Sequence, residues 1–238
     1  MRFYRRLMPF KAITFDLDDT LYDNFPVIAH LETETLQWLS ERHPKTATQP
    51  IEWWRQLKLD IARQQPLITH DVTKWRFTQL YTGFCHLGYQ DSEALQAAQE
   101  TIEHVLTLRN NINVPSVTHT VLQQLAEQFP LIAITNGNAD PQRFGLGHYF
   151  AQVYRAGPDG KMKPSGQMFE QAREFLSFPS HQILHVGDHL RSDIQGAKNA
   201  GFSACWINET KQDVRLLANA SILPDVEITQ LEQLLKLF

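Results

Sequence analysis

Residues 12–20 read Ala-Ile-Thr-Phe-Asp-Leu-Asp-Asp-Thr, and the interpretation of the whole chain starts from this stretch. Its first four residues include β-branched and aromatic side chains, which is typical of a buried strand. Three carboxylates in four positions follow directly: Asp16, Asp18 and Asp19. Carboxylates are rarely buried unless they are paired or bound to a metal. The sequence therefore predicts a strand whose carboxyl end carries a site for a divalent cation.

The composition is that of an ordinary globular protein. The chain has 238 residues, of which 42% are hydrophobic and 20% are charged, and its formal net charge is -4. Nucleic acid is not indicated as a partner because no basic run is present, and no apolar run reaches the ~18 residues of a membrane span. Cys85 and Cys205 lie far apart, which favours two free thiols in a reducing compartment. We expect a cytoplasmic protein with no membrane partner, as a monomer or a homodimer.

The segment from residue 26 to residue 109 predicts helices only. Apolar residues recur there at three- and four-residue spacing in four successive stripes. Turn-forming residues separate the stripes at His43-Pro44, Gln65-Pro66 and Gly88. Four amphipathic helices in sequence favour a small helical bundle.

After residue 115 the pattern changes to alternating helices and strands. The apolar run at residues 131–135 predicts a strand covered on both faces, residues 183–186 and 202–207 predict two more strands, and residues 152–155 predict a short one. A helix capped by Ser165 is expected among the intervening helices. This alternation predicts an α/β fold with a Rossmann-like, doubly wound parallel sheet.

The predicted helical bundle separates the first strand from all the others. We therefore expect an α/β core domain made of residues 1–22 and 112–238, with an α-helical cap domain inserted at residues 23–111. Doubly wound sheets bind ligands beyond the carboxyl ends of their strands. Because the chain leaves the sheet for the insert at that edge, we expect the insert to act as a lid over a site.

Polar, reactive residues follow the predicted strands. Asp16 ends the first strand, Thr135-Asn136 end the second, and Gly187-Asp188 end the fourth. Lys163 is expected at the same edge of the sheet because its loop follows the third strand. This set suits an aspartate nucleophile attacking phosphorus, with a lysine and Mg²⁺ offsetting the repulsion between the two anions. Hard oxygen ligands of this kind suit Mg²⁺.

Four motifs in this order resemble those of the haloacid dehalogenase (HAD) superfamily. They are Asp-Leu-Asp-Asp-Thr at residues 16–20, Thr135-Asn136, Lys163-Pro164, and Gly187-Asp188 with Asp193. The resemblance covers the whole chain, and the insert is similar to that family's helical cap. It implies a Mg²⁺-dependent phosphatase that hydrolyses a small phosphate monoester through an aspartyl-phosphate intermediate.

The resemblance also implies a role for each matched residue. Asp16 would be the nucleophile, and Asp18 would be the general acid/base. Thr135 would bind the phosphoryl group with the help of the Asn136 backbone. Lys163 would bind the phosphoryl group too and neutralise charge between it and the nucleophile.

The implied metal site draws on four aspartates. Asp16 and Asp188 would ligate Mg²⁺ through their carboxylates, and Asp18 through its backbone carbonyl. Asp193 would either ligate the ion or support it from the second layer of residues.

Four stretches resemble a bacterial group of phosphatases within this superfamily, at residues 15–24, 70–77, 134–139 and 155–158. That group is associated with FMN and with 5-amino-6-(5-phosphoribitylamino)uracil, a phosphorylated intermediate of riboflavin biosynthesis. The resemblance, and not periodicity or spacing, therefore implies a flavin-pathway substrate. Trp53, Trp54 and Trp75 in the insert either stack on a planar ring or form the core of the bundle. Lys74 and Arg76 are interpreted as solvated charges of the insert.

Other functions on the same scaffold stay open at this point. A hydrolytic dehalogenase also uses an aspartate nucleophile, but it lacks the acid two residues later because halide leaves without a proton. Asp18 argues against that reaction. A phosphomutase keeps both aspartates and must exclude water. A non-enzymatic binding module would not need Asp16, Asp18, Lys163 and Asp188, all of which are present.

Overall fold

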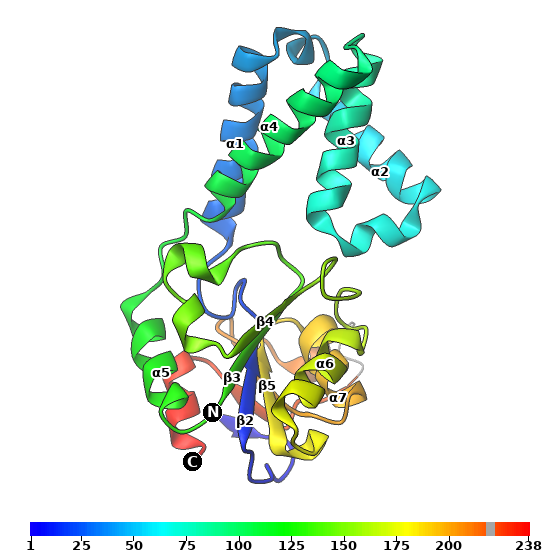
Figure 1. Cartoon of the computed structure of the whole chain (residues 1–238). Coiled ribbons are helices and arrows are strands. Elements are labelled where there is room, and N and C mark those ends of the chain that lie inside the picture. The colour runs from blue at the N-terminus through cyan, green and yellow to red at the C-terminus, as the bar shows by residue number, and fades with distance from the viewer. Residues whose placement is uncertain (218–221) are drawn as a thin grey trace. The chain divides into compact units, whose positions relative to one another are not determined.

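The structure is a computed structural model that describes residues 1–217 and 222–238 (Figure 1). The chain forms two compact units. Met1–Asp23 and Asn113–Phe238 make an α/β unit, and Asn24–Ile112 make a helical unit. Within the described residues, the structure contains no helix with the length and apolar character needed to cross a membrane.

Four helices build the helical unit, as the four apolar stripes predict. They are α1 (Phe25–Arg42), α2 (Ile51–Gln64), α3 (Val72–His86) and α4 (Asp91–Arg109). The Asp71 carboxylate caps α3 by accepting a hydrogen bond from the Lys74 backbone N–H. Buried side chains from all four helices form the core, including Leu39, Trp54, Leu80 and Phe84. Trp54 thus belongs to the core of the bundle.

A seven-stranded sheet forms the centre of the α/β unit (Figure 1). Its strands run in the order β1-β7-β6-β5-β2-β3-β4 and span Arg2–Phe3 (β1), Ala12–Phe15 (β2), Leu131–Thr135 (β3), Gln152–Arg155 (β4), Ile183–Gly187 (β5), Ser203–Ile207 (β6) and Val226–Ile228 (β7). All neighbours are parallel except β1, which pairs antiparallel with β7 at the edge of the sheet. The expected doubly wound sheet is confirmed, and the antiparallel edge strand is an addition that the apolar runs do not predict.

Helices cover both faces of the sheet. Figure 1 shows α5 (Ser116–Ala126) on one side and α6 (Gln167–Leu176) and α7 (Gly196–Asn199) on the other. One local prediction is wrong: α6 begins at Gln167 with Gly166 in the capping position, so Ser165 is not its cap. The helix is fixed instead by its buried apolar face, which includes Met168 and Phe169.

The position of β2 defines where a ligand can bind. β2 lies between β3 and β5, and the chain reaches β3 on one side and β5 on the other, so the winding direction reverses here. All residues of these three strands are buried. The Asp16 backbone N–H donates to the Val186 carbonyl at 2.9 Å, which extends the sheet pairing by one residue beyond β2. Asp16 is therefore held rigidly at the switch point.

Truncation of the helical core tests this packing. We expect Phe84→Ala to lower the free energy of unfolding by about 3–5 kcal/mol, because the fully buried ring leaves a cavity. Leu67→Ala is the control, since Leu67 is 69% exposed and should change stability by about 0.5 kcal/mol or less. Urea denaturation measures both, and equal effects of the two substitutions would contradict the packing.

Candidate active site

The Lys163 ammonium is the centre of the site. Its side chain is buried, although lysine is rarely buried without a partner. The Nζ atom donates to Asp16 Oδ1 at 2.7 Å and to the Ile134 carbonyl at 2.5 Å, and it pairs with Asp193 Oδ1 at 2.7 Å. These three contacts use all three protons of the ammonium. Lys163 thus joins β2, β3 and the segment after β5.

Asn136 holds the Lys163 backbone in place. Its side-chain Nδ2 donates to the Lys163 carbonyl at 3.0 Å, and its Oδ1 accepts from the Lys163 N–H at 2.6 Å. The end of β3 is thereby tied to the loop that carries the lysine. The motif positions predict a backbone role for Asn136, and this paired side-chain contact is a further role that they do not reveal.

Asp193 is buried beside the lysine. Its Oδ1 contacts the Lys163 ammonium, and its Oδ2 accepts from the His189 N–H at 2.9 Å. His185 Nε2 lies 3.5 Å from the same Oδ1. A Cβ atom at Gly187 would collide with the Asp193 side chain, so glycine is required there. The only sequence signal of this close approach is that a glycine, Gly187, ends the strand directly before Asp188.

Asp188 completes a group of three carboxylates. Its Oδ1 accepts from the Thr20 hydroxyl at 3.3 Å, and its backbone carbonyl accepts from the Trp206 indole N–H at 2.7 Å. One carboxylate oxygen each of Asp16, Asp188 and Asp193 lies within 4.8 Å of the others. These three residues, predicted from two different motifs, therefore converge on one place.

The electrostatics of this group favour a bound cation. Burial raises the pKa of Asp16 well above its ordinary value, even though the Lys163 charge opposes the shift. Burial, and then the nearby charges of Asp193 and Asp19, raise the pKa of Asp188 to about 7. Burial also acts on Asp193, but Lys163 and His185 outweigh it and hold the Asp193 pKa below its ordinary value.

The charges around Lys163 do not balance. Three carboxylates face one ammonium, whose own pKa is raised by Asp16 and Asp193 against the effect of burial. A divalent cation with oxygen ligands fits this donor set, because it would remove the excess negative charge. Both Asp193 oxygens already accept protein hydrogen bonds or ion pairs, so its position suits support of the cation through its neighbours more than direct ligation.

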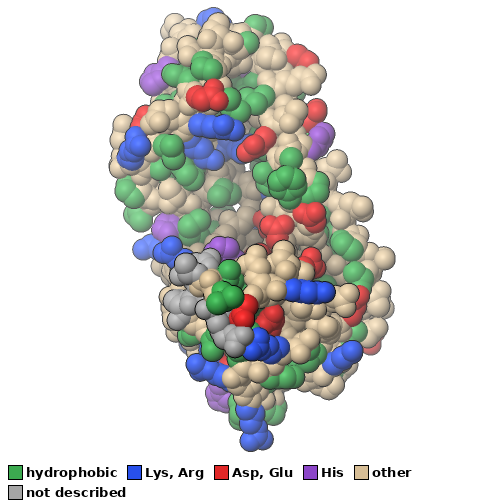
Figure 2. All heavy atoms as spheres, turned by 180° about the vertical axis from the view of Figure 1, so that it is seen from behind, with side chains coloured by type: hydrophobic (Ala, Val, Ile, Leu, Met, Phe, Trp, Pro, Cys, Tyr) green, Lys and Arg blue, Asp and Glu red, His purple; other side chains and the backbone are tan. Residues whose placement is uncertain are grey.

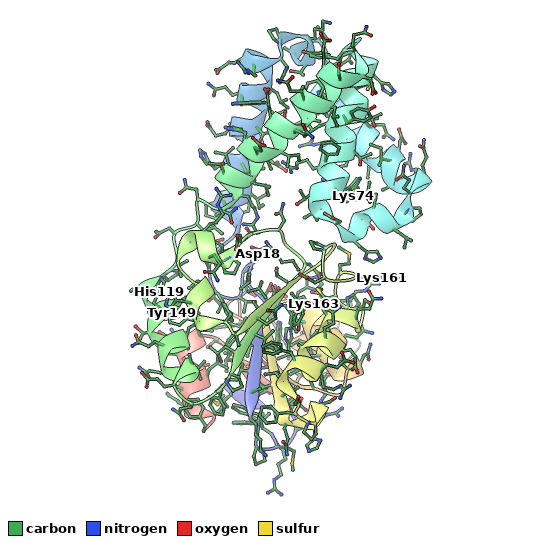
Figure 3. All side chains as sticks on the ribbon, viewed as in Figure 1. Asp18, Lys74, His119, Tyr149, Lys161 and Lys163 are labelled. Atoms are coloured by element: carbon green, nitrogen blue, oxygen red, sulfur yellow. The ribbon has the colours of Figure 1, made fainter. Side chains whose placement is uncertain are left out.

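Asp18 and Thr135 lie at the same end of the sheet but outside the carboxylate group. Asp18 is half-buried, and its Oδ1 accepts from the Tyr22 hydroxyl at 2.6 Å. Thr135 is buried at the end of β3, and its Oγ1 accepts from the Gly137 N–H at 3.0 Å. Figure 3 shows Asp18 and Lys163 beyond the carboxyl ends of the strands. Each of the seven residues of the predicted site thus lies at the end of a strand of one sheet or in the segment that follows a strand.

Comparison with known proteins gives a consistent result. A family model described as haloacid dehalogenase-like hydrolase matches residues 10–201. The chain is 44% identical over 237 residues to the Escherichia coli 5-amino-6-(5-phospho-D-ribitylamino)uracil phosphatase YigB, covering 100% of both chains. It is 27% identical over 230 residues to a glyceraldehyde 3-phosphate phosphatase of Methanopyrus kandleri, covering 94% of this chain and 95% of that protein.

One solved structure extends the likeness to three dimensions. The crystal structure of a 2-haloacid dehalogenase from Pseudomonas syringae pv. tomato matches with a TM-score of 0.90 and 36% sequence identity. The match covers 95% of this chain and 97% of that one. The chain is therefore similar over its whole length both to proteins named as phosphatases and to one named as a dehalogenase.

Removal of the central ammonium tests the geometry of the site. We expect Lys163→Met to lower the free energy of unfolding by about 3–5 kcal/mol, because Asp16 and Asp193 lose their buried cation. Lys161→Met is the matched control, since Lys161 is an exposed lysine two residues away (Figure 3). Thermal and urea unfolding measure both, and a Lys163→Met protein as stable as its control would contradict the buried ion-pair arrangement.

Proposed function

Since the chain belongs to the haloacid dehalogenase-like hydrolase family, we propose that it is a phosphatase that hydrolyses a small phosphate monoester through a phosphorylated aspartate. One observation carries the proposal: a buried lysine contacts Asp16 at the switch point of the sheet, beside two more carboxylates. A carboxylate nucleophile, a fixed cation and ligands for a divalent cation are the groups needed to bring one anion to another.

In the first step, Asp16 attacks phosphorus. A bond forms between its carboxylate oxygen and phosphorus, and the bond from phosphorus to the ester oxygen breaks. Asp18 gives its proton to the departing alkoxide. The Lys163 ammonium offsets the negative charge on the nucleophile and on the phosphoryl oxygens. The Thr135 hydroxyl and nearby backbone N–H groups hold those oxygens.

In the second step, water releases the phosphate. Asp18, now ionised, takes a proton from a water molecule, and that water attacks phosphorus. The bond from phosphorus to the Asp16 oxygen breaks, so that Asp16 is regenerated as a carboxylate and Asp18 as an acid. The Tyr22 hydroxyl, which donates to Asp18, keeps this carboxyl group in one orientation between the two steps.

Asp16 and Asp188 would hold Mg²⁺ through their carboxylates, and Asp18 through its backbone carbonyl. The bound ion supplies charge that favours the ionised form of the nucleophile and neutralises the phosphoryl group. Asp193 contacts the Lys163 ammonium and accepts a hydrogen bond from the His189 N–H, and these contacts would keep the neighbouring metal ligands in place. The helical unit would act as a cap that excludes water during the first step.

The substrate proposal rests on the relatives. Identity of 44% over the full length to YigB supports 5-amino-6-(5-phospho-D-ribitylamino)uracil as the substrate, and FMN shares its ribityl phosphate. The glyceraldehyde 3-phosphate phosphatase at 27% identity is a small-ester phosphatase as well. A ribityl phosphate of the riboflavin pathway is therefore our first choice among small esters.

Dehalogenation is the second candidate because the solved structure at 36% identity is named a 2-haloacid dehalogenase. That reaction also begins with an aspartate nucleophile, but a halide leaves without a proton. Asp18 lies two residues after the nucleophile and accepts a hydrogen bond from Tyr22, and in a dehalogenase its acid would have no function. The retained acid favours the phosphatase over the dehalogenase. Release of free phosphate by hydrolysis distinguishes a phosphatase from a phosphomutase.

A substrate panel tests the proposed activity. We expect Mg²⁺-dependent phosphate release that is highest on the ribitylaminouracil phosphate or on FMN among esters that include sugar phosphates and nucleotides. EDTA should abolish the release and added Mg²⁺ should restore it. The same protein should release no halide from 2-chloropropionate. Halide release without phosphate release would establish the dehalogenase instead, and no release of either would remove both.

Two substitutions test the proposed roles of the carboxylates. Asp16→Asn should lower kcat by about 10⁴-fold or more because the amide is not a nucleophile, and Asp18→Asn should lower it by about 10²–10⁴-fold through loss of acid–base catalysis. Asp19→Asn is the matched control. Asp19 is exposed with φ 58°, a backbone conformation that Asn tolerates, so the Asp19→Asn protein should retain its activity. Substantial activity in Asp16→Asn protein would exclude Asp16 as the nucleophile.

A further inference from the structure

A cavity of about 160 Å³ that is open to solvent on one side lies in the helical unit, bounded by α1, α2 and α3. Its charged and polar walls come from Glu32 on α1, Arg55 and Lys58 on α2, and Arg76 and Gln79 on α3. The remaining walls are mainly apolar and include the Trp54 side chain. All of these residues belong to one compact unit, and none has a part in the proposed hydrolysis.

The charges that line this cavity are unbalanced. Three cationic side chains face it and only one carboxylate, that of Glu32. Figure 2 shows Lys and Arg side chains gathered together on the helical unit, with Asp and Glu side chains beside them. A cavity with this excess of positive charge attracts anions.

Lys58 and Arg76 are half-buried in this wall, and in the described part of the chain neither has a carboxylate within ion-pair distance. Burial lowers the pKa of the Lys58 ammonium, and the Arg76 charge lowers it further, whereas the Glu32 charge opposes the shift. Burial also lowers the pKa of Arg76, and the Glu32 charge again opposes the shift. The two cations therefore repel each other in a partly desolvated place.

Two other cations of the same unit form ion pairs. Arg63 pairs with Asp60 at 2.6 Å, and Arg42 with Glu100 at 3.6 Å, both at the surface. Lys58 has an aromatic contact instead: its Nζ lies 4.5 Å from the centre of the Trp75 ring, whose indole N–H donates to the Lys58 carbonyl at 2.9 Å. This contact fixes the position of the ammonium without neutralising it. Within the residues that the structure describes, the fold thus places two cations without an ion-pair partner in one half-buried wall, with Glu32 as the one carboxylate there, at a cost in desolvation that a bound anion would offset.

We propose that this cavity is a binding site for a small organic anion, whose carboxylate or phosphate group pairs with Lys58 and Arg76 and whose apolar part lies against the Trp54 side of the cavity. The Arg76 guanidinium offers a planar pair of donors suited to either group. The volume admits a molecule with one anionic group and a few carbon atoms. The interpretation of Arg76 as a solvated charge, made from the sequence, is replaced by this role.

Binding is measured by calorimetry on the full chain, with benzoate as the probe and benzamide as its neutral counterpart. Benzoate should bind to the wild type. Lys58→Gln and Arg76→Gln should each raise its dissociation constant about tenfold or more. Lys74→Gln is the matched control, because Lys74 is an exposed lysine on α3 (Figure 3), and its binding should equal that of the wild type. Benzamide should not bind. Absence of benzoate binding to the wild type, or equal binding by all variants, would overturn the proposal.

Thermal unfolding separates loss of the site from loss of the fold. Removal of a half-buried cation that has no ion-pair partner among the described residues should leave the Tm of Arg76→Gln protein equal to or above that of the wild type, and benzoate should raise the Tm of the wild type only. A lower Tm in Arg76→Gln protein without benzoate would show that Arg76 is structural and would contradict the site. Neither measurement requires turnover, so both are independent of the proposed phosphatase activity.

Two sources can provide such an anion, and inhibition of phosphate release distinguishes them. Competition of benzoate with the ester that Lys58→Gln and Arg76→Gln remove would show that the cavity receives an anionic part of the substrate. Benzoate that changes the rate without competing would show a separate anion as the ligand. Either result supports the site, and benzoate that binds in calorimetry without any effect on release would likewise show a separate anion as the ligand.

Discussion

The contact of the Lys163 ammonium with Asp16 and Asp193 is the constraint on which the α/β unit depends. It places a full positive charge in the interior, where only close and complete pairing makes such a charge tolerable. Three strand ends must meet for that pairing to exist: the end of β2 supplies Asp16, the end of β3 supplies the Ile134 carbonyl, and the segment after β5 supplies Asp193. Parallel strands in this order bring their carboxyl ends to one edge of the sheet, so the topology itself brings the residues of the site together. In the proposed mechanism, the same lysine offsets the negative charge on the Asp16 carboxylate when a phosphate approaches it.

Much of this was predictable from the sequence because the controlling signals are local. Each buried parallel strand is a short apolar run, and the runs at residues 131–135 and 152–155 match β3 and β4 in both bounds. The four helical stripes give four helices because an amphipathic helix must bury its apolar face. Asp16, Lys163 and Asp188 were predicted to meet because each lies at or near the end of a strand or in the loop after one, and the structure brings the carboxylates and the lysine together.

The features that the sequence did not reveal are set by tertiary contacts. The antiparallel pairing of β1 with β7 joins residues more than two hundred positions apart through backbone hydrogen bonds, which leave no pattern in so short a strand. Serine is a favoured residue type at the N-cap of a helix, but the buried face of α6 determines that this helix begins after Ser165. The hold of the Asn136 side chain on the Lys163 backbone needs two loops that are distant in sequence. The charged cavity of the helical unit draws its walls from three helices, and each of its cations alone resembles an ordinary surface residue.

The central claim is that Asp16 becomes covalently phosphorylated, and rapid acid quench with ³²P-labelled para-nitrophenyl phosphate tests it most directly. This ester has a leaving group that needs no proton, so Asp18→Asn protein should complete the first step and stall before the second. The account predicts a burst of nitrophenolate and an equal amount of acid-stable, hydroxylamine-sensitive label on the peptide that contains Asp16. A burst without label on that peptide, or label on a different residue, would contradict it.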